Sequence, residues 1–191
     1  MKPIDLHGFD RKFAQDDDPW STFSNLDEAR KRHAILHGIG PAPVGRVLEL
    51  AAGNGSNSVA LARAALRLDA TEGTRSGTEL VRRAVGEDRR VRVRRLVLPG
   101  RFPGITYDAM VVAELLYYLS PAAMAKVARD TAAALPRGGR LVLAHHRVDY
   151  PDFVQHADGI HRRFLAQTKA RWAVANDVRT GRWQVQSYVR G

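Results

Sequence analysis

The sequence predicts an α/β fold, in which a mostly parallel, seven-stranded sheet carries helices on both faces and an antiparallel hairpin at its C-terminal end. Short apolar segments alternate with helical segments between residues 46 and 144, which is the pattern of parallel strands joined by crossover helices. Polar and apolar residues then alternate on both sides of Thr180-Gly181, which indicates two strands joined by a tight turn. Five strands in the alternating part and two in the hairpin give seven.

The length of 191 residues and the hydrophobic content of 45% fit one domain. We expect an N-terminal arm with a lid helix over 1–44, a ligand-binding core over 45–147, and a helix with the hairpin over 148–191. No apolar stretch reaches the roughly 18 residues of a membrane span, and the N-terminus lacks a secretory signal, so we expect a cytoplasmic protein. The absence of cysteine excludes disulfide scaffolds, zinc–thiolate sites and thiol nucleophiles.

The formal net charge of +10 makes anionic partners worth considering. The densest basic cluster runs from Arg82 to Arg101, and no aromatic residue interrupts it before Phe102. Base stacking on aromatic side chains is the usual way to bind single-stranded nucleic acid. We therefore expect a solvated basic face and no specific nucleic-acid site.

The first 24 residues are polar and are predicted to be irregular. Asn25 is expected to cap a helix over 25–37, with Glu28 completing a capping box and Gly38 ending the helix. A connector rich in glycine and proline follows and ends at Pro43.

Strands and helices then follow in turn. A helix is expected to begin at Ser120-Pro121, where serine caps it and proline occupies its first turn, and to end before Pro136. In the second strand, Leu66, Leu68 and Ala70 are expected on one face. The predicted strands cover 46–50, 66–71, 91–98, 108–113 and 140–144, and the other predicted helices cover 56–65 and 75–85.

In such sheets, ligands bind beyond the carboxyl ends of the strands. The first strand leads into a glycine-rich turn, Ala51 to Gly55, which lacks both the phosphate-loop pattern and the complete dinucleotide pattern. Glu72 ends the second strand, at the place where an acid accepts hydrogen bonds from a ribose diol. A structural tight turn and a helix-capping acid are the alternatives. The two features together favour a ligand that contains adenosine.

The ends of the fourth and fifth strands carry the remaining candidates, which are an acid, two tyrosines and two histidines. Adjacent side chains on a strand point in opposite directions, so the histidine pair makes a poor metal site and we expect no metal. Each histidine has three possible roles, which are handling a proton, orienting a substrate and packing in the core. These candidates are Glu114, Tyr117, Tyr118, His145 and His146.

The segment Glu49–Gly55 resembles the first motif of class I methyltransferases that use S-adenosylmethionine, with Ala51 in place of the usual first glycine. Glu72 matches the ribose-binding acid of their second motif. Three features are similar to the nodulation S-type (NodS) N-methyltransferases, namely Asp18-Pro19-Trp20, Glu28 with Arg32-His33, and the segment Tyr107–Leu119. The resemblance spans about residues 9 to 147 and implies a Rossmann-like fold, S-adenosylmethionine as cofactor and S-adenosylhomocysteine as product.

The family's N-methylation of an amino sugar implies a small-molecule acceptor for this chain, and an amino sugar is one candidate. An amine must be neutral to attack, so Glu114 or His145 is expected to accept its proton, with Tyr117 and His146 orienting the acceptor. One departure is the absence of an acid after the third strand, where Val97 and Leu98 offer only backbone groups to adenine. The predicted cofactor-binding residues are Trp20, Arg32, Glu49, Ala51, Gly53, Gly55, Glu72, Gly73, Val97, Leu98 and Ala113.

Trp20 and Arg32 are assigned to the lid, where Trp20 covers the ligand and Arg32 meets the carboxylate of the methionine moiety. Trp20 as a core anchor and Arg32 as part of a basic helix face are the alternatives. Two other functions also stay open at this point. One is O-methylation of a sugar or small hydroxyl compound by the same machinery, and the other is a non-catalytic, basic RNA-binding module on the same fold.

Overall fold

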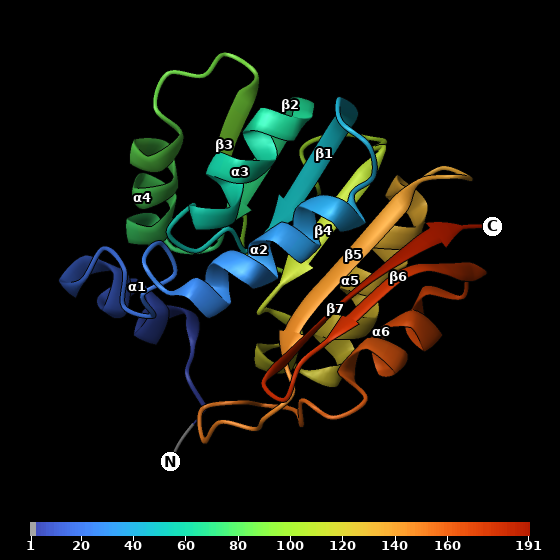
Figure 1. Ribbon diagram of the computed structural model, residues 1–191. Helices are drawn as coiled ribbons and strands as arrows, with labels where there is room; N and C mark the ends of the chain where they lie inside the picture. Colours follow the sequence, from blue (N-terminus) through green and yellow to red (C-terminus); the bar gives the residue numbers. More distant parts are fainter. Residues whose placement is uncertain (1–2) are drawn as a thin grey trace.

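The computed structural model describes residues 3–191, which form a seven-stranded sheet with the order β3-β2-β1-β4-β5-β7-β6 (Figure 1). Within these residues, β7 runs antiparallel to both of its neighbours, and the other pairings in the sheet are parallel. The strands are β1 (Val44–Leu50), β2 (Ala65–Glu72), β3 (Val91–Arg95), β4 (Ala109–Ala113), β5 (Arg140–His146), β6 (Trp172–Arg179) and β7 (Trp183–Arg190).

Helices cover both faces of this sheet. One face packs against α2 (Leu26–Gly38), α3 (Ser56–Ala64) and α4 (Arg75–Val85). The other packs against α5 (Pro121–Ala134), α6 (Ile160–Thr168) and the short 3₁₀ helix η1 (Leu116–Tyr118). A further helix, α1 (Leu6–Gln15), contacts α4 and lies near the carboxyl ends of the first strands (Figure 1). The predicted fold class is therefore confirmed.

The central strands are apolar because both of their faces are buried. All five residues of β4 are buried, with alternate side chains contributing to the two cores. Val111 packs towards α2 and α3, whereas Met110 and Val112 pack towards α5 and α6. Ser120 accepts a hydrogen bond from the amide of Ala123 at the start of α5, as its sequence predicts.

The N-terminal segment differs from its prediction, because α1 forms where irregular chain was expected. Asp5 caps this helix by accepting from the amide of Gly8 at 2.8 Å. Phe9 and Phe13 lie one turn apart and both contact the ring of Trp20, so tertiary packing stabilises a helix that is weak in isolation. The polar composition of this segment gave no sign that the two phenylalanine rings would pack against Trp20.

Three smaller predictions were also wrong. Asn25 caps α2 as expected, but Glu28 does not complete a capping box, because its carboxylate accepts from Lys31 instead. Leu66 is 58% exposed at the start of β2 and does not share the core with Leu68. The third strand ends at Arg95, short of the predicted residue 98.

In the part of the chain that the structure describes, no helix is long and apolar enough to cross a membrane.

Candidate active site

The parallel strands bring the predicted site residues to one edge of the sheet. In the strand register, Glu49 pairs with Ala70 on β2 and with Val111 on β4, and Ala113 pairs with Ala144 on β5. The turn after β1, the acid that ends β2 and the loop after β4 therefore leave the sheet side by side.

The turn after β1 depends on left-handed backbone conformations. Ala51, Gly53 and Gly55 have φ angles of 54°, 62° and 88°. A Cβ atom on Gly55 would lie 3.0 Å from the Cα of Val81, so glycine is also needed for the close approach of α4. The turn is fixed at its start by the amide of Ala52, which donates to the carbonyl of Thr71 at 2.8 Å.

Glu72 joins this turn to the start of α4. One carboxylate oxygen accepts from the amide of Gly53 at 3.1 Å, and the other accepts from the amide and hydroxyl of Thr74 at 2.8 and 2.9 Å. The residue is only 6% exposed, and this burial raises its pKa above the ordinary value even though the hydrogen bonds favour the charged form.

A second buried acid, Glu49, lies on β1. It is 1% exposed and accepts from the hydroxyl of Ser58 at 2.5 Å. Burial raises the pKa of Glu49 to about 8, and the nearby charge of Glu72 adds to the shift. Among residues 3–191, no basic side chain forms a salt bridge with either acid. The site is therefore suited to a ligand that brings its own positive charge.

The N-terminal arm is attached directly to the glycine turn. The side-chain amide of Asn54 donates to the carboxylate of Asp18 at 2.8 Å, and the hydroxyl of Thr22 donates to the carbonyl oxygen of Asn54 at 3.0 Å. Phe13 also reaches Gly53, since its ring lies 3.7 Å from where a Cβ would be. The arm therefore covers the turn, and the sequence, which predicts a lid over residues 1–44, did not indicate these contacts with Asn54 and Gly53.

Trp20 and Arg32 lie within this arrangement. Trp20 is 41% exposed, with its ring near those of Phe9 and Phe13. The guanidinium of Arg32 donates to the carbonyl of Thr22, while its Nε atom is buried and, within the described residues, without a hydrogen-bond partner. Arg32 thus retains a free donor beneath the arm.

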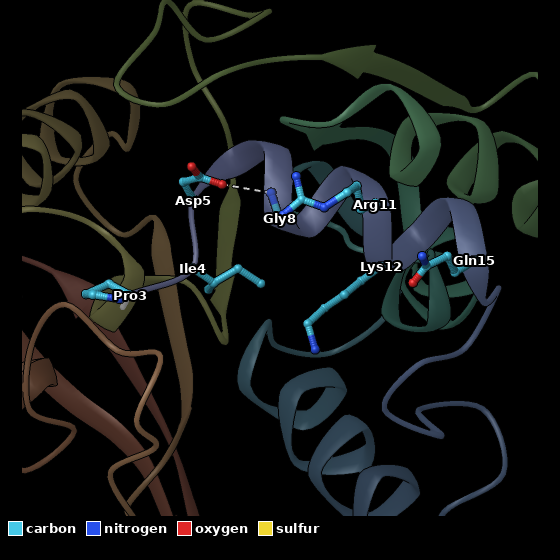
Figure 2. Close-up of a pocket in the computed structure, with 7 residues that line it drawn as sticks. All are labelled: Pro3, Ile4, Asp5, Gly8, Arg11, Lys12 and Gln15. Atoms are coloured by element: carbon cyan, nitrogen blue, oxygen red, sulfur yellow. Dashed lines mark hydrogen bonds between the residues drawn. The ribbon is translucent and has the colours of Figure 1, made fainter. Parts of the chain in front are cut away.

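A hollow of about 460 Å³ lies along α1, where Ile4 and Lys12 project to the same side of the helix (Figure 2). Neither the glycine turn nor the end of β4 contributes to its lining. Lys12 also lies 5.6 Å from the centre of the Trp20 ring. The hollow is lined by Pro3, Ile4, Asp5, Gly8, Arg11, Lys12 and Gln15.

Glu114 follows β4 in a left-handed conformation, with a φ angle of 51°. Its side chain is 30% exposed. One carboxylate oxygen accepts from the Nζ of Lys31 at 2.6 Å, and the other accepts from the hydroxyl of Tyr117. Tyr117 is itself buried, with its ring stacked 3.7 Å from the ring of Phe153. The acid is therefore held from two sides and still faces solvent.

Lys31, which no pattern in the sequence singled out, is only 3% exposed. It binds Glu28 at 2.8 Å as well as Glu114. Burial alone would lower the pKa of Lys31, but the two carboxylates raise it above the ordinary value, so the ammonium stays charged. Its position on the buried face of α2, beside Ala34 and Ile35, was the available signal.

The two histidines at the end of β5 differ in their surroundings. His145 is fully buried, and both of its ring nitrogens have hydrogen-bond partners. The side chain of His146 is 26% exposed, and its Nε2 lies 3.9 Å from the carboxylate of Glu114. His146 is therefore the histidine that borders the acid on its exposed side.

The remaining predicted residues lie along the same edge. Gly73 is adjacent to Val97, whose Cα lies 4.0 Å from where a Cβ on Gly73 would be. Val97 is 49% exposed and Ala113 is buried at the end of β4. Within residues 3–191, no group of three or more His, Asp or Glu side chains is placed to hold a metal ion.

No protein-family model matches the chain, and no curated protein matches it in sequence. Solved structures do match. The N-methyltransferase NodS from Bradyrhizobium japonicum WM9, in complex with S-adenosyl-L-homocysteine, has a TM-score of 0.83 at 20% identity, over 97% of both chains. A putative methyltransferase from Pseudomonas syringae has a TM-score of 0.74 at 23% identity, over 87% of this chain and 100% of that one.

Geranyl diphosphate C-methyltransferase from Streptomyces coelicolor A3(2) has a TM-score of 0.70 at 15% identity, over 86% of this chain and 78% of that one. The matched proteins thus include an N-methyltransferase and a C-methyltransferase on one architecture. The chain has the Rossmann-like fold of the class I methyltransferases.

Proposed function

We propose that this chain is an S-adenosylmethionine-dependent methyltransferase that acts on a small molecule. The observation that carries the proposal is the pair of buried acids, Glu49 and Glu72, beside a glycine turn at the carboxyl edge of the sheet. S-adenosylmethionine carries a sulfonium and an ammonium cation, and its adenosine carries a ribose diol. The cations supply the positive charge that is missing beside the two acids, and the ribose hydroxyls can donate to Glu72 in addition to its present donors.

Different residues at the carboxyl edge of the sheet are assigned to the ribose, adenine and methionine parts of the cofactor. We assign Glu72 to accepting hydrogen bonds from the ribose hydroxyls, and the turn from Ala51 to Gly55 to the close approach of the backbone to the cofactor. The backbone of Gly73, Val97 and Leu98 borders the adenine. At the methionine end of the cofactor, Arg32 offers its free Nε to the carboxylate and Glu49 attracts the ammonium. Ala113 lines the bottom of the site, and Trp20 belongs to the N-terminal arm that covers it.

When bound, the cofactor supplies a methyl group that an acceptor displaces in line from sulfur. We assign the acceptor's proton to Glu114, because its carboxylate is partly exposed and is held by Lys31 and Tyr117. His146 borders the same opening and is assigned to orienting the acceptor. Positioning provides much of the rate in such a displacement.

An amine is the acceptor that this cluster favours. Glu28 and Glu114 together outweigh the single charge of Lys31, so the local charge attracts a cationic ammonium. N-methylation of an amino sugar, which the resemblance of the sequence to the NodS family implies, is one instance. Transfer to a hydroxyl is the second candidate, because Lys31 could stabilise a developing alkoxide.

Replacing Glu72 with glutamine is expected to weaken S-adenosylhomocysteine binding by about tenfold to a hundredfold. The amide keeps the shape but loses the charge, and a hydrogen bond to a charged group contributes about 1.5–3 kcal/mol. Isothermal titration calorimetry measures the change. Glu79→Gln, on the exposed side of α4, is the matched control and should bind as the wild type does.

Unchanged affinity in a folded Glu72→Gln variant would contradict this assignment. The alternative of a basic RNA-binding module predicts a different outcome, in which the wild type binds no S-adenosylhomocysteine and binds RNA with an affinity that falls steeply with salt.

A further inference from the structure

A buried row of hydrogen bonds runs from the loop after β4 to β7. The amides of Leu115 and Leu116 donate to Nε2 of His145 at 3.3 and 3.1 Å. Nδ1 of His145 lies 3.0 Å from Nε2 of His161, and Nδ1 of His161 lies 2.8 Å from the side-chain oxygen of Gln186. Both histidines are buried, at 0% and 2% exposure.

These contacts allow one placement of the protons. Two amides donate to Nε2 of His145, so this nitrogen carries no hydrogen and the ring proton sits on Nδ1. It is donated to Nε2 of His161, whose own proton on Nδ1 is donated to Gln186. The amide group of Gln186 donates in turn to Asp177 on β6 at 2.9 Å, which fixes its oxygen towards His161. Every member of the row is therefore satisfied with both rings neutral.

The row supports the backbone that carries Glu114. The amide of Glu114 donates to the carbonyl of Ala144 at 2.8 Å, which continues the pairing of β4 with β5. The next two amides leave that pairing and are received by His145 alone. Because Glu114 itself has a positive φ angle, the direction of its side chain depends on this local support.

We propose that His145 is a positioning residue, whose neutral ring, fixed by His161 and Gln186, holds the turn that directs Glu114. It is not the proton acceptor, because neither ring nitrogen faces the exposed side of the site. This role rests on the proposed function in one respect, namely that Glu114 faces the acceptor.

The groups around His145 oppose its protonation. Burial comes first, followed by electrostatic interactions with His161 on α6, Lys31 on α2 and His146 on β5, and together they hold the pKa of His145 well below its usual value. The edge of the Tyr117 ring faces it from η1 at 5.3 Å between centroids. A second ring proton would point at two amide donors, so we expect the turn to stay intact at pH values where an exposed histidine is already protonated.

Amide hydrogen exchange in the free protein tests this role without any substrate. In His145→Leu, the amides of Leu115 and Leu116 are expected to exchange at least tenfold faster, while those of Val111 and Val112 in the centre of β4 stay protected. His145→Gln, which keeps an acceptor for the two amides, should restore much of the protection. If the His145 variants do not fold, His161→Asn provides a second test, because it removes the acceptor of the His145 proton. The amides of Leu115 and Leu116 should then exchange faster than in the wild type, by a smaller factor than in His145→Leu.

Kinetics and nitrogen chemical shifts complete the test. We expect kcat to fall in His145→Leu and to recover partly in His145→Gln, with the S-adenosylhomocysteine affinity and the acceptor KM little changed. The His145 ring in the wild type should stay neutral and protonated on Nδ1 over the pH range in which an exposed histidine titrates. Full protection of both amides in His145→Leu, or a ring that titrates in this range together with kcat, would overturn the role.

A failure of the proposed function would look different. A wild-type protein that binds no S-adenosylhomocysteine would refute the methyltransferase proposal, whereas the exchange and tautomer results would still decide whether His145 holds the turn.

Discussion

Replacing Glu114 with glutamine is expected to lower kcat by about a hundredfold or more while S-adenosylhomocysteine binds with nearly unchanged affinity. General-base catalysis contributes about 10²–10⁴-fold, and the amide cannot accept the acceptor's proton. The fold should tolerate the change, because an amide oxygen can still accept from Lys31 or Tyr117 and Lys31 keeps its contact with Glu28. Single-turnover methyl transfer and calorimetry separate the two quantities.

Glu28→Gln is the matched control for this experiment. It also leaves Lys31 with one carboxylate, but it removes the acid on the less exposed side of the cluster. If the loss in Glu114→Gln came only from disturbing Lys31, both variants would lose activity equally. We expect kcat of Glu28→Gln to fall far less, and equal losses would assign the proton transfer to another group.

Replacing Glu49 with glutamine is expected to stabilise the free protein at pH 7 by about 3 kcal/mol. Burial raises the pKa of Glu49 to about 8 from an ordinary value of 4.5, so between these pH values the folded chain holds a proton that the unfolded chain releases. The free energy of unfolding therefore falls as the pH rises from about 4.5 to about 8. Glutamine does not titrate and can still accept from Ser58.

Urea unfolding of the free protein at pH 5 and pH 7 measures this difference. The gain from Glu49→Gln should be small at pH 5 and large at pH 7, because the cost of the acid develops between them. Glu79→Gln, at an exposed position, should follow the wild type at both pH values. An equal gain at both pH values would assign the effect to packing and not to the proton.

The elements that could be predicted are those whose local signals agree with their tertiary environment. Helix α4 has its predicted bounds, since Thr74 caps it and Gly86 follows its last residue. Glu72 and Glu114 were predicted at the same edge of the sheet because each directly follows a predicted strand. Crossover helices make these strands parallel, so their carboxyl ends meet at one edge. Such features depend on neighbours in sequence.

The features that could not be predicted depend on residues far apart in the chain. Lys31 and Glu114 are separated by 83 positions, and no local pattern marks their contact. The choice between His145 and His146 on β5 depends on a partner, His161, that lies on α6. The first helix was missed because Phe9 and Phe13 need Trp20 to pack against.

The position of β7 has a consequence for the order in which the molecule is assembled. This strand comes last along the sequence but enters the sheet between β5 and β6, so both of them present an open edge until it arrives. During synthesis on the ribosome, the five strands before the hairpin can pair with one another while the edge of β5 is still uncovered. The same strand brings Gln186, so the loop that carries Glu114 gains its full support only when the sheet closes. A nascent chain halted before β7 would thus have five paired strands and a loop around Glu114 that lacks part of its support.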